Sequence, residues 1–315
     1  MLEAIYLIAS LIGIMVSSYV FTENIENVLK SRGFSMRTIG SVIAPLFTSA
    51  PELIIILISL FILSKNLSKE VISGVVLGEP FTVLSMGFFL FSIAMINVRT
   101  REDETIESKV LFLYIAISSI TILLGMLIPY GNYVSAIFLI LIYAFATAKN
   151  SKRTDKNIKE DVKEVGEYNH PFRVLFIALS AILLTASSYF LLRSIEEISK
   201  QLMIPTFYAS LILIPIGTIL PELMNSIFWG RKGKLELALG NLGGESFIFI
   251  TIYPALALLT GFFYYSFGTY ILTITIIANA IFFYLITRFF KNYVRIFSSG
   301  LLFYIVYIFF SLITK

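Results

Sequence analysis

The sequence predicts an all-α membrane protein with ten transmembrane helices, arranged as two inverted five-helix repeats with both termini outside. Two observations support this prediction: repeated apolar runs of about 20 residues, and two matching proline–glutamate segments 170 residues apart. The chain of 315 residues is 57% hydrophobic and 14% charged, with a mean hydropathy of +0.88. Soluble domains carry roughly 25% charged residues, and the apolar runs do not alternate with polar residues as β-barrel strands do.

Each expected span is an apolar run long enough to cross the hydrocarbon core of a bilayer. The ten spans are 4–21, 38–64, 70–97, 110–128, 132–148, 172–192, 204–229, 235–260, 268–287 and 296–313. No basic residue precedes the first run, so we expect a span there and not a cleaved signal peptide. An even number of spans places both termini on the same side of the membrane.

The basic residues give the orientation. Of the 24 Lys and Arg residues, 19 lie in or beside the loops after spans 1, 3, 5, 7 and 9, and five lie on the other side. Because positive charge is retained in the cytoplasm, this split predicts a multi-pass protein of the cell membrane with its long central loop cytoplasmic. It also accounts for the net charge of +4, so nucleic acid is not expected as a partner.

One long polar segment divides the chain. Residues 149–171 are expected to form a cytoplasmic connecting loop between the first repeat, 1–148, and the second, inverted repeat, 172–315. Five spans per repeat is an odd number, so the two repeats enter the membrane with opposite orientation. We expect the loop to be a tether, with a regulatory or lipid-contacting role as the alternative. Its histidine, His170, is the only one in the chain and is expected to be solvated.

Two segments in spans 2 and 7 nearly repeat each other. PLFTSAPEL occupies 45–53 and PIGTILPEL occupies 215–223, and five of the nine positions are identical. A proline lacks an N–H and clashes with the carbonyl four residues earlier, so these prolines should free backbone oxygens. The prolines are Pro45, Pro51, Pro215 and Pro221. Freed carbonyls cannot face lipid, but they can line a cavity or contact an ion.

Each segment also places a hydroxyl and a carboxylate on one helix face. Thr48 lies four residues before Glu52, and Thr218 lies four residues before Glu222. These are hard oxygen donors, which suit calcium and sodium better than copper or zinc. The alternative is that the prolines only kink packed helices and the glutamates bond to nearby hydroxyls. A carboxylate inside a membrane costs about 2.5–3.5 kcal/mol on insertion scales, and two in matching positions favour a bound cation.

Two more glutamates lie in the spans that follow. Glu79 stands before a proline in span 3, and Glu245 follows a glycine-rich stretch in span 8. We expect these two to converge with Glu52 and Glu222, the alternative being a wet vestibule or gate. All three aspartates lie in predicted loops and the chain has no cysteine. Thiolate metal sites and disulfides are therefore excluded, and no cofactor is expected.

At these residues the chain resembles the cation/calcium exchanger superfamily, closest to its sodium/calcium exchanger branch, as a divergent member. Residues 48–52 (TSAPE) and 217–222 (GTILPE) are similar to the G-T-S-x-P-E-like hallmark of spans 2 and 7 in that family. Residues 240–244 (GNLGG) are similar to its G-N-x-x-G-S/N-like hallmark of spans 3 and 8. Two departures are Ile219, which replaces the hallmark serine, and Glu79, which stands in place of an asparagine.

The resemblance implies that Glu52 and Glu222 are the central calcium ligands. It further implies that Thr48 and Thr218 give oxygens to calcium and sodium, and that Ser49 borders a sodium site. The full set of expected cation-site residues is Glu52, Glu222, Thr48, Thr218, Ser49, Glu79, Glu245, Asn241, Pro45 and Pro215.

The resulting expectation is a secondary antiporter that exchanges calcium for sodium by alternating access at a midplane glutamate site. One alternative is an antiporter of calcium, or of another divalent cation, and protons that uses the same glutamates. The other is a passive cation channel or an ion sensor. An enzyme is not expected, because the chain has no HExxH pair, no intramembrane aspartate dyad and no cysteine. The expected partners are transported cations and the lipid bilayer, and a monomer is expected.

Overall fold

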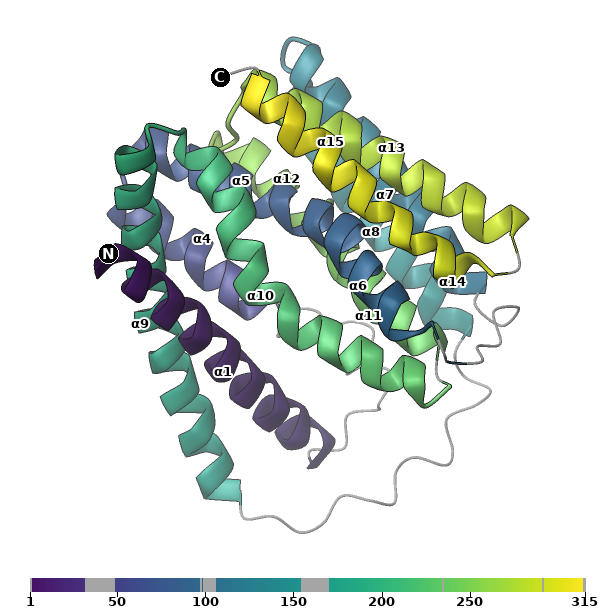
Figure 1. Ribbon diagram of the computed structural model, residues 1–315, viewed down its shortest axis with the longest axis horizontal. Coiled ribbons are helices and arrows are strands. Elements are labelled where there is room, and N and C mark those ends of the chain that lie inside the picture. The colour runs from purple at the N-terminus through teal and green to yellow at the C-terminus, as the bar shows by residue number, and fades with distance from the viewer. Residues whose placement is uncertain are drawn as a thin grey trace.

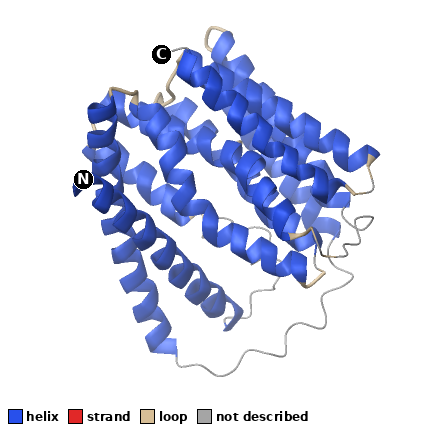
Figure 2. Cartoon of the chain, in the orientation of Figure 1, coloured by secondary structure: helices blue, strands red, loops and turns tan. Residues whose placement is uncertain are grey.

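The computed structural model describes residues 2–31, 49–96, 98, 106–153, 170–233, 235–290 and 292–313. Figure 2 shows helices joined by loops, with no strand in this part of the chain. The all-α prediction is therefore confirmed over the described residues. Helices suit an apolar chain, because they satisfy backbone hydrogen bonds without help from the surrounding solvent.

The helices of the first half, labelled in Figure 1, are α1 (Leu2–Ser31), α4 (Ala50–Ile62), α5 (Lys65–Thr82), the π-helical turn η2 (Val83–Gly87), α6 (Phe88–Ala94), α7 (Ile106–Leu127) and α8 (Gly131–Arg153). Those of the second half are α9 (His170–Leu202), α10 (Thr206–Arg231), α11 (Leu235–Phe249), α12 (Ile252–Thr260), α13 (Phe267–Phe289), α14 (Tyr293–Ile296), the 3₁₀ turn η6 (Phe297–Ser299) and α15 (Gly300–Ile313).

Seven helical segments of the described chain are long and apolar enough to cross a membrane. An eighth is obtained if the two arms of α10, which meet at a bend of 44°, are counted as one span. Two shorter apolar helices cover Ile5–Phe21 and Pro51–Ile62. The chain is thus a multi-pass membrane protein by the length and composition of its helices.

The helices beside the central loop are longer than expected. α8 continues to Arg153 and α9 begins at His170, so residues 149–153 and 170–171, which we placed in the loop over 149–171, are helical. Lysine and arginine are good helix formers, and neither glycine nor proline interrupts residues 149–153, so nothing in that sequence ends α8 at the edge of the apolar run. Residues 154–169 lie outside the described residues.

Prolines mark three of the irregular points in the fold. Pro51 lies in the first turn of α4, where its missing N–H would have no partner in any case. Pro80 lies inside α5, and the π-helical turn η2 begins three residues later. The bend in α10 lies between Leu220 and Glu222, and so at Pro221, as the loss of a ladder hydrogen bond requires. A fourth irregularity is the break between α11 and α12 at residues 250–251.

Small residues bring α5 against α10. A Cβ atom on Gly78 would lie 2.8 Å from the carbonyl oxygen of Leu211, and one on Gly74 would lie 2.9 Å from that of Phe207. Only glycine permits this approach, and glycines four residues apart are a common device for close helix packing in membranes. The contact fixes Glu79, the residue after Gly78, beside the middle of α10.

An aromatic cluster joins four other elements of the fold. The rings of Phe88, Phe112, Phe283 and Phe297 lie 4.7–5.6 Å apart in every pairing, and all four are buried. They come from α6, α7, α13 and η6. Offset and edge-to-face aromatic contacts of this kind add to the packing energy of the core.

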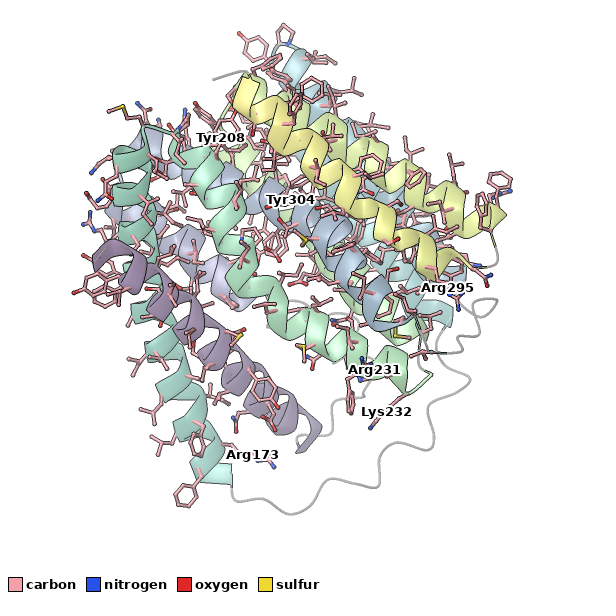
Figure 3. All side chains as sticks on the ribbon, viewed as in Figure 1. Arg173, Tyr208, Arg231, Lys232, Arg295 and Tyr304 are labelled. Atoms are coloured by element: carbon pink, nitrogen blue, oxygen red, sulfur yellow. The ribbon has the colours of Figure 1, made fainter. Side chains whose placement is uncertain are left out.

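The two ends of the helix bundle differ. α1 begins and α15 ends at the same end of the bundle, and α1 packs along α9 (Figure 1). The labelled basic side chains Arg173, Arg231, Lys232 and Arg295 lie at the opposite end (Figure 3). The described ends of the chain and these basic residues are therefore separated by the length of the bundle.

Candidate cation site

Three glutamates far apart in the sequence meet in the core. Glu52 lies in the first turn of α4, Glu79 near the end of α5, and Glu245 in α11. One carboxylate oxygen from each lies within 4.8 Å of the other two, and all three side chains are buried. Helix ends and breaks make this possible, because each of the three lies within a few residues of a helix terminus or an irregular turn.

The spacing suits a single shared ion. Oxygens that bind one calcium ion at 2.3–2.6 Å can be about 4.6–5.2 Å apart at most, and the limit of 4.8 Å lies inside that range. Magnesium binds oxygen at 2.0–2.1 Å, which limits its ligand oxygens to about 4.2 Å. The donor set is carboxylate oxygen only, as hard cations prefer.

Glu222 lies next to this group without being part of it. It follows the bend in α10 and is also buried. Its charge interacts with those of Glu52, Glu79 and Glu245, although its oxygens are not within the 4.8 Å grouping. The four glutamates expected to converge lie close together, and the three whose oxygens all lie within 4.8 Å of one another are Glu52, Glu79 and Glu245.

Most of these carboxylate oxygens have no hydrogen-bond partner among the described residues. This holds for both oxygens of Glu52 and Glu245 and for one oxygen each of Glu79 and Glu222. The buried residues of the described chain include no Lys, Arg or His that could supply a positive charge. Burying carboxylates without partners is costly, so the arrangement calls for a cation or for protons.

Thr218 provides a neutral side-chain contact to the three-glutamate group. Its hydroxyl lies 3.1 Å from Oε2 of Glu79 and 3.2 Å from the carbonyl oxygen of Ile214. Pro215 is buried on the same helix and has no N–H, so the carbonyl oxygen of Leu211, four residues earlier, lacks its usual helical hydrogen bond. That carbonyl oxygen faces Gly78. This segment of α10 thus meets α5 through a hydroxyl and a backbone oxygen, beside Glu79.

Asn241 links α11 to the arm of α10 that follows the bend. Its side-chain amide donates to the carbonyl oxygen of Glu222 at 3.1 Å and lies 3.0 Å from the hydroxyl of Ser226. It therefore contacts the backbone of a glutamate and not a carboxylate. In this structure Asn241 positions the second arm of α10, where Glu222 is located.

Ser49 pairs with a residue that sequence reasoning missed. Its hydroxyl lies 2.9 Å from the hydroxyl of Tyr253 in α12, and both residues are buried. Tyr253 also interacts electrostatically with Glu52 and Glu245. A tyrosine one residue before a proline in span 8 was a visible signal, but its partner was 204 positions away in the chain.

Not every expected site residue can be placed. Thr48 and Pro45 lie outside the described residues. Glu52, Glu79, Glu222, Glu245, Thr218, Ser49, Asn241 and Pro215 all lie in or beside the region described above.

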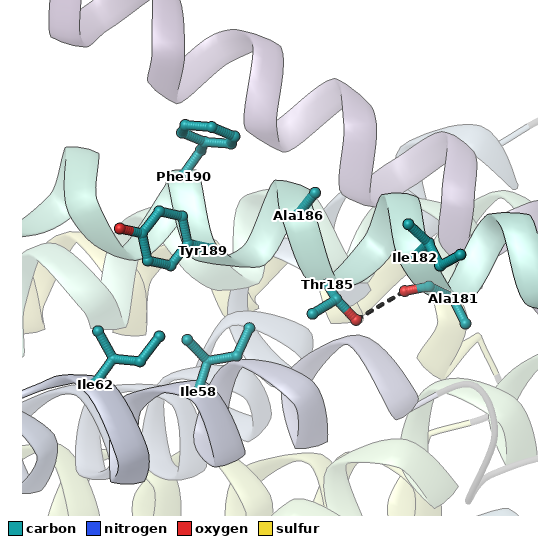
Figure 4. Close-up of a pocket in the computed structure, with 8 residues that line it drawn as sticks. All are labelled: Ile58, Ile62, Ala181, Ile182, Thr185, Ala186, Tyr189 and Phe190. Atoms are coloured by element: carbon teal, nitrogen blue, oxygen red, sulfur yellow. Dashed lines mark hydrogen bonds between the residues drawn. The ribbon is translucent and has the colours of Figure 1, made fainter.

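A groove elsewhere on the molecule is unsuited to ions. It lies between α4 and α9, and its wall consists of Ile58, Ile62, Ala181, Ile182, Thr185, Ala186, Tyr189 and Phe190 (Figure 4). The hydroxyl of Thr185, which donates to the carbonyl of Ala181 at 2.8 Å, and that of Tyr189 are the only side-chain polar groups among the described residues of this wall, and no carboxylate is among them. The polar chemistry of the described chain is therefore at the glutamates and not in this groove.

Comparison with known proteins gives a family and a fold. The profile of the family described as "Sodium/calcium exchanger protein" matches residues 2–150 and 172–314. The "Inner membrane protein YrbG" of Escherichia coli (strain K12) is 23% identical over 221 residues, which are 68% of this chain and 66% of that protein. The chain spans 54–66% of the length of the first three curated relatives that it matches.

Solved structures share the architecture. The "H+/Ca2+ Exchanger CAX" superposes with a TM-score of 0.64 at 14% identity, covering 98% of this chain and 88% of the other. The sodium-calcium exchanger NCX_Mj superposes with a TM-score of 0.60 at 19% identity, covering 98% and 97%. At these identities the likeness concerns the fold.

Proposed function

Because the chain belongs to the sodium/calcium exchanger protein family, we propose that it is an antiporter that moves calcium across the membrane in exchange for sodium. It is a divergent member of the cation/calcium exchanger superfamily, a group of transporters and not of enzymes. The observation that carries the proposal is the group of three buried carboxylates within 4.8 Å of one another, with no buried positive side chain among the described residues.

The proposed membrane arrangement has ten spans in two inverted repeats. The seven long helices, the bent α10 and the two shorter apolar helices supply the ten spans. The packing supports a two-fold relation, because helix contacts occur in matching pairs. α1 packs on α10 as α9 packs on α4, and α12 packs on α8 as η2 packs on α15. Exchanging spans 1–5 with spans 6–10 puts α1 in the place of α9, α4 in that of α10, η2 in that of α12 and α8 in that of α15. The first contact of each pair then becomes the second.

The proposed orientation has both termini outside and the central loop in the cytoplasm. The basic residues Arg173, Arg231, Lys232 and Arg295 lie at one end of the bundle (Figure 3). By the positive-inside rule, that end faces the cytoplasm. The start of α1 and the end of α15 lie at the other end of the bundle.

Alternating access requires an element that moves past a fixed site. α1 and α9 pack on each other along their length and contact the rest of the bundle mainly through α4 and α10. We assign them to the moving gate. Glu52 and Glu222 sit on α4 and α10, the helices that α1 and α9 touch, so movement of the pair exposes the site to one side and then the other. A neutralised site crosses the apolar barrier more easily than bare carboxylates do.

Protons are the second candidate for the coupling ion, and the composition of the site favours them. Three carboxylates share one group and a fourth, Glu222, interacts with their charges. Ile219 replaces a hydroxyl, and Thr218 is the one described hydroxyl within hydrogen-bond distance of the three-glutamate group. Carboxylates in a dry environment can exchange protons near neutral pH, so calcium and protons would compete for the same oxygens.

The test is radiolabelled calcium uptake into proteoliposomes under an imposed sodium gradient or an imposed pH gradient. Wild type is compared with Glu222→Gln and with the matched control Glu196→Gln, a glutamate of α9 that pairs with Arg193 and Lys200 outside the site. Sodium-driven uptake that is lost in Glu222→Gln and kept in Glu196→Gln supports sodium/calcium exchange. Uptake driven by the pH gradient alone moves the assignment to protons, unitary currents without exchange indicate a channel, and no flux under either gradient refutes the calcium assignment.

A further inference from the structure

A tyrosine–serine hydrogen bond joins the two halves of the chain beside the glutamates. The hydroxyls of Tyr253 and Ser49 lie 2.9 Å apart, and the tyrosine hydroxyl also lies 3.4 Å from the carbonyl oxygen of Ser49. Ser49 has 1% and Tyr253 has 5% of its surface exposed. A hydrogen bond this deeply buried is well ordered, because breaking it would leave polar atoms without a partner in a dry environment.

Each end of this bond belongs to a helix end that carries a glutamate. Ser49 is the residue at which α4 begins, three positions before Glu52, and its hydroxyl does not cap the helix. Tyr253 lies at the start of α12, just after the break that follows α11, the helix of Glu245. The tyrosine ring stacks on Phe249 of α11 with centroids 4.6 Å apart and an angle of 15° between the rings. The ring therefore bridges the break and reaches α4.

The glutamates need such a connection. The carboxylates of Glu52 and Glu245 repel each other, and their oxygens make no hydrogen bond within the described residues. Their separation thus depends on how the backbones of α4 and α11 are held. The bond between Ser49 and Tyr253 is a side-chain link between the start of α4 and the broken span that carries Glu245.

We infer that Tyr253 is a positioning residue of the calcium site, whose hydroxyl holds the first turn of α4 so that Glu52 and Glu245 can share one cation. This inference rests on the proposed calcium exchange. Tyr253 acts through Ser49 and is not itself assigned as a cation ligand. Loss of the bond should let the repelling carboxylates separate, so calcium must bring them together again when it binds.

The expected effect is on affinity. A buried neutral hydrogen bond contributes enough to change a binding constant by about fivefold. Tyr253→Phe keeps the ring and its stacking on Phe249 but removes the hydroxyl. We expect it to raise the KM for calcium by about fivefold and to leave kcat nearly unchanged.

The experiment measures calcium uptake into proteoliposomes against calcium concentration for wild type, Tyr253→Phe, Ser49→Ala and the double variant. Ser49→Thr keeps a hydroxyl and should retain the wild-type KM. The matched control is Tyr307→Phe, since Tyr307 is also buried and its hydroxyl has no partner among the described residues. The calcium concentration needed to raise the Tm of the purified protein gives a second readout that does not require transport.

If the inference holds, both single variants and the double variant shift KM by the same factor, because each removes the same bond. The inference is overturned if Tyr253→Phe matches wild type in KM and in the Tm titration. It is also overturned if Ser49→Ala alone raises KM, because Ser49 would then act on the cation without Tyr253. If wild type itself shows no calcium flux and no calcium-induced Tm shift, the result refutes the proposed calcium exchange, which distinguishes that failure from a failure of the Tyr253 inference. Should Tyr253→Phe fail to fold, Ser49→Ala still tests the bond in the other direction, because a wild-type KM and a wild-type Tm titration in Ser49→Ala overturn the inference.

Discussion

Replacing Glu79 by glutamine should move protein stability in opposite directions with and without calcium. Glutamine keeps the shape of the side chain and an oxygen that can accept from Thr218, now 3.1 Å from Glu79. It removes the charge that faces Glu52 and Glu245. Two unit charges 4.8 Å apart, the largest separation of these oxygens, repel by about 3.5 kcal/mol at an effective dielectric constant of 20. Oxygens that lie closer repel more strongly, and protonation of one neighbour removes the repulsion for that pair.

The calcium-bound state should lose stability relative to wild type. At a calcium concentration of 100 times Kd, binding stabilises the folded protein by about 2.7 kcal/mol. A tenfold loss of affinity in Glu79→Gln leaves about 1.4 kcal/mol at the same calcium concentration. The calcium-induced rise in Tm should therefore fall to about half or less of the wild-type rise.

The assay is thermal denaturation of the purified protein in detergent, with a calcium chelator and with a calcium titration. Glu79→Gln should melt at a higher temperature than wild type in chelator and gain less from calcium. The matched control is Glu70→Gln on the same helix, whose carboxylate accepts from the backbone N–H of Phe207 at 3.1 Å, away from the cluster. It should keep the full calcium response. A wild-type calcium response in Glu79→Gln, or a lower Tm in chelator, would refute the reasoning.

Three further outcomes are expected. Gly78→Ala should abolish uptake and lower the Tm, because the new Cβ would lie 2.8 Å from the carbonyl oxygen of Leu211. The control variant Gly240→Ala should be tolerated, because nothing lies within 4 Å of its Cβ. If the two variants behaved alike, the packing argument would be contradicted. Asn241→Leu removes the donor to the Glu222 carbonyl and should cost about 1–3 kcal/mol, seen as a lower Tm in chelator, and an unchanged Tm would count against that link. Lowering the pH on the calcium side should raise the KM for calcium without lowering the rate at saturating calcium, because protons and calcium compete for the same carboxylates. A fall in the rate at saturating calcium with an unchanged KM would argue against shared oxygens.

The helices and the acidic residues of the site could be predicted from the sequence for physical reasons. Apolar runs of membrane length predict helices, and the all-α architecture is confirmed over the described residues. Acids inside such runs are rare, so Glu52, Glu79, Glu222 and Glu245 were candidates by their position alone, and the structure brings them close together. The bend at Pro221 followed from the chemistry of proline.

Other features depend on tertiary packing and were not visible. The motif symmetry suggested Glu52 and Glu222 as the central pair, whereas the three carboxylates whose oxygens all lie within 4.8 Å of one another are those of Glu52, Glu79 and Glu245. The spacing of the motifs does not show which of the four carboxylates share one group. For the same reason the pairing of Ser49 with Tyr253 could not be predicted. The extension of α8 beyond the apolar run of its span was not expected, because polar helix formers continue a helix past the residues that cross the membrane.

The π-helical turn at Val83–Gly87 separates two tasks within one span. One additional residue in a turn rotates everything after it by about 100° relative to an uninterrupted α-helix. Before the turn, Glu79 lies in the three-glutamate group, and after it Phe88 and Phe91 are completely buried, with Phe88 in the aromatic cluster. Gly300 of α15 lies against the carbonyl oxygens of Leu84 and Ser85, within the irregular turn. A single inserted residue can thus change which face a helix offers to its surroundings without lengthening the loops around it. The turn therefore joins a half-span that carries a buried carboxylate to a half-span that packs against aromatic rings.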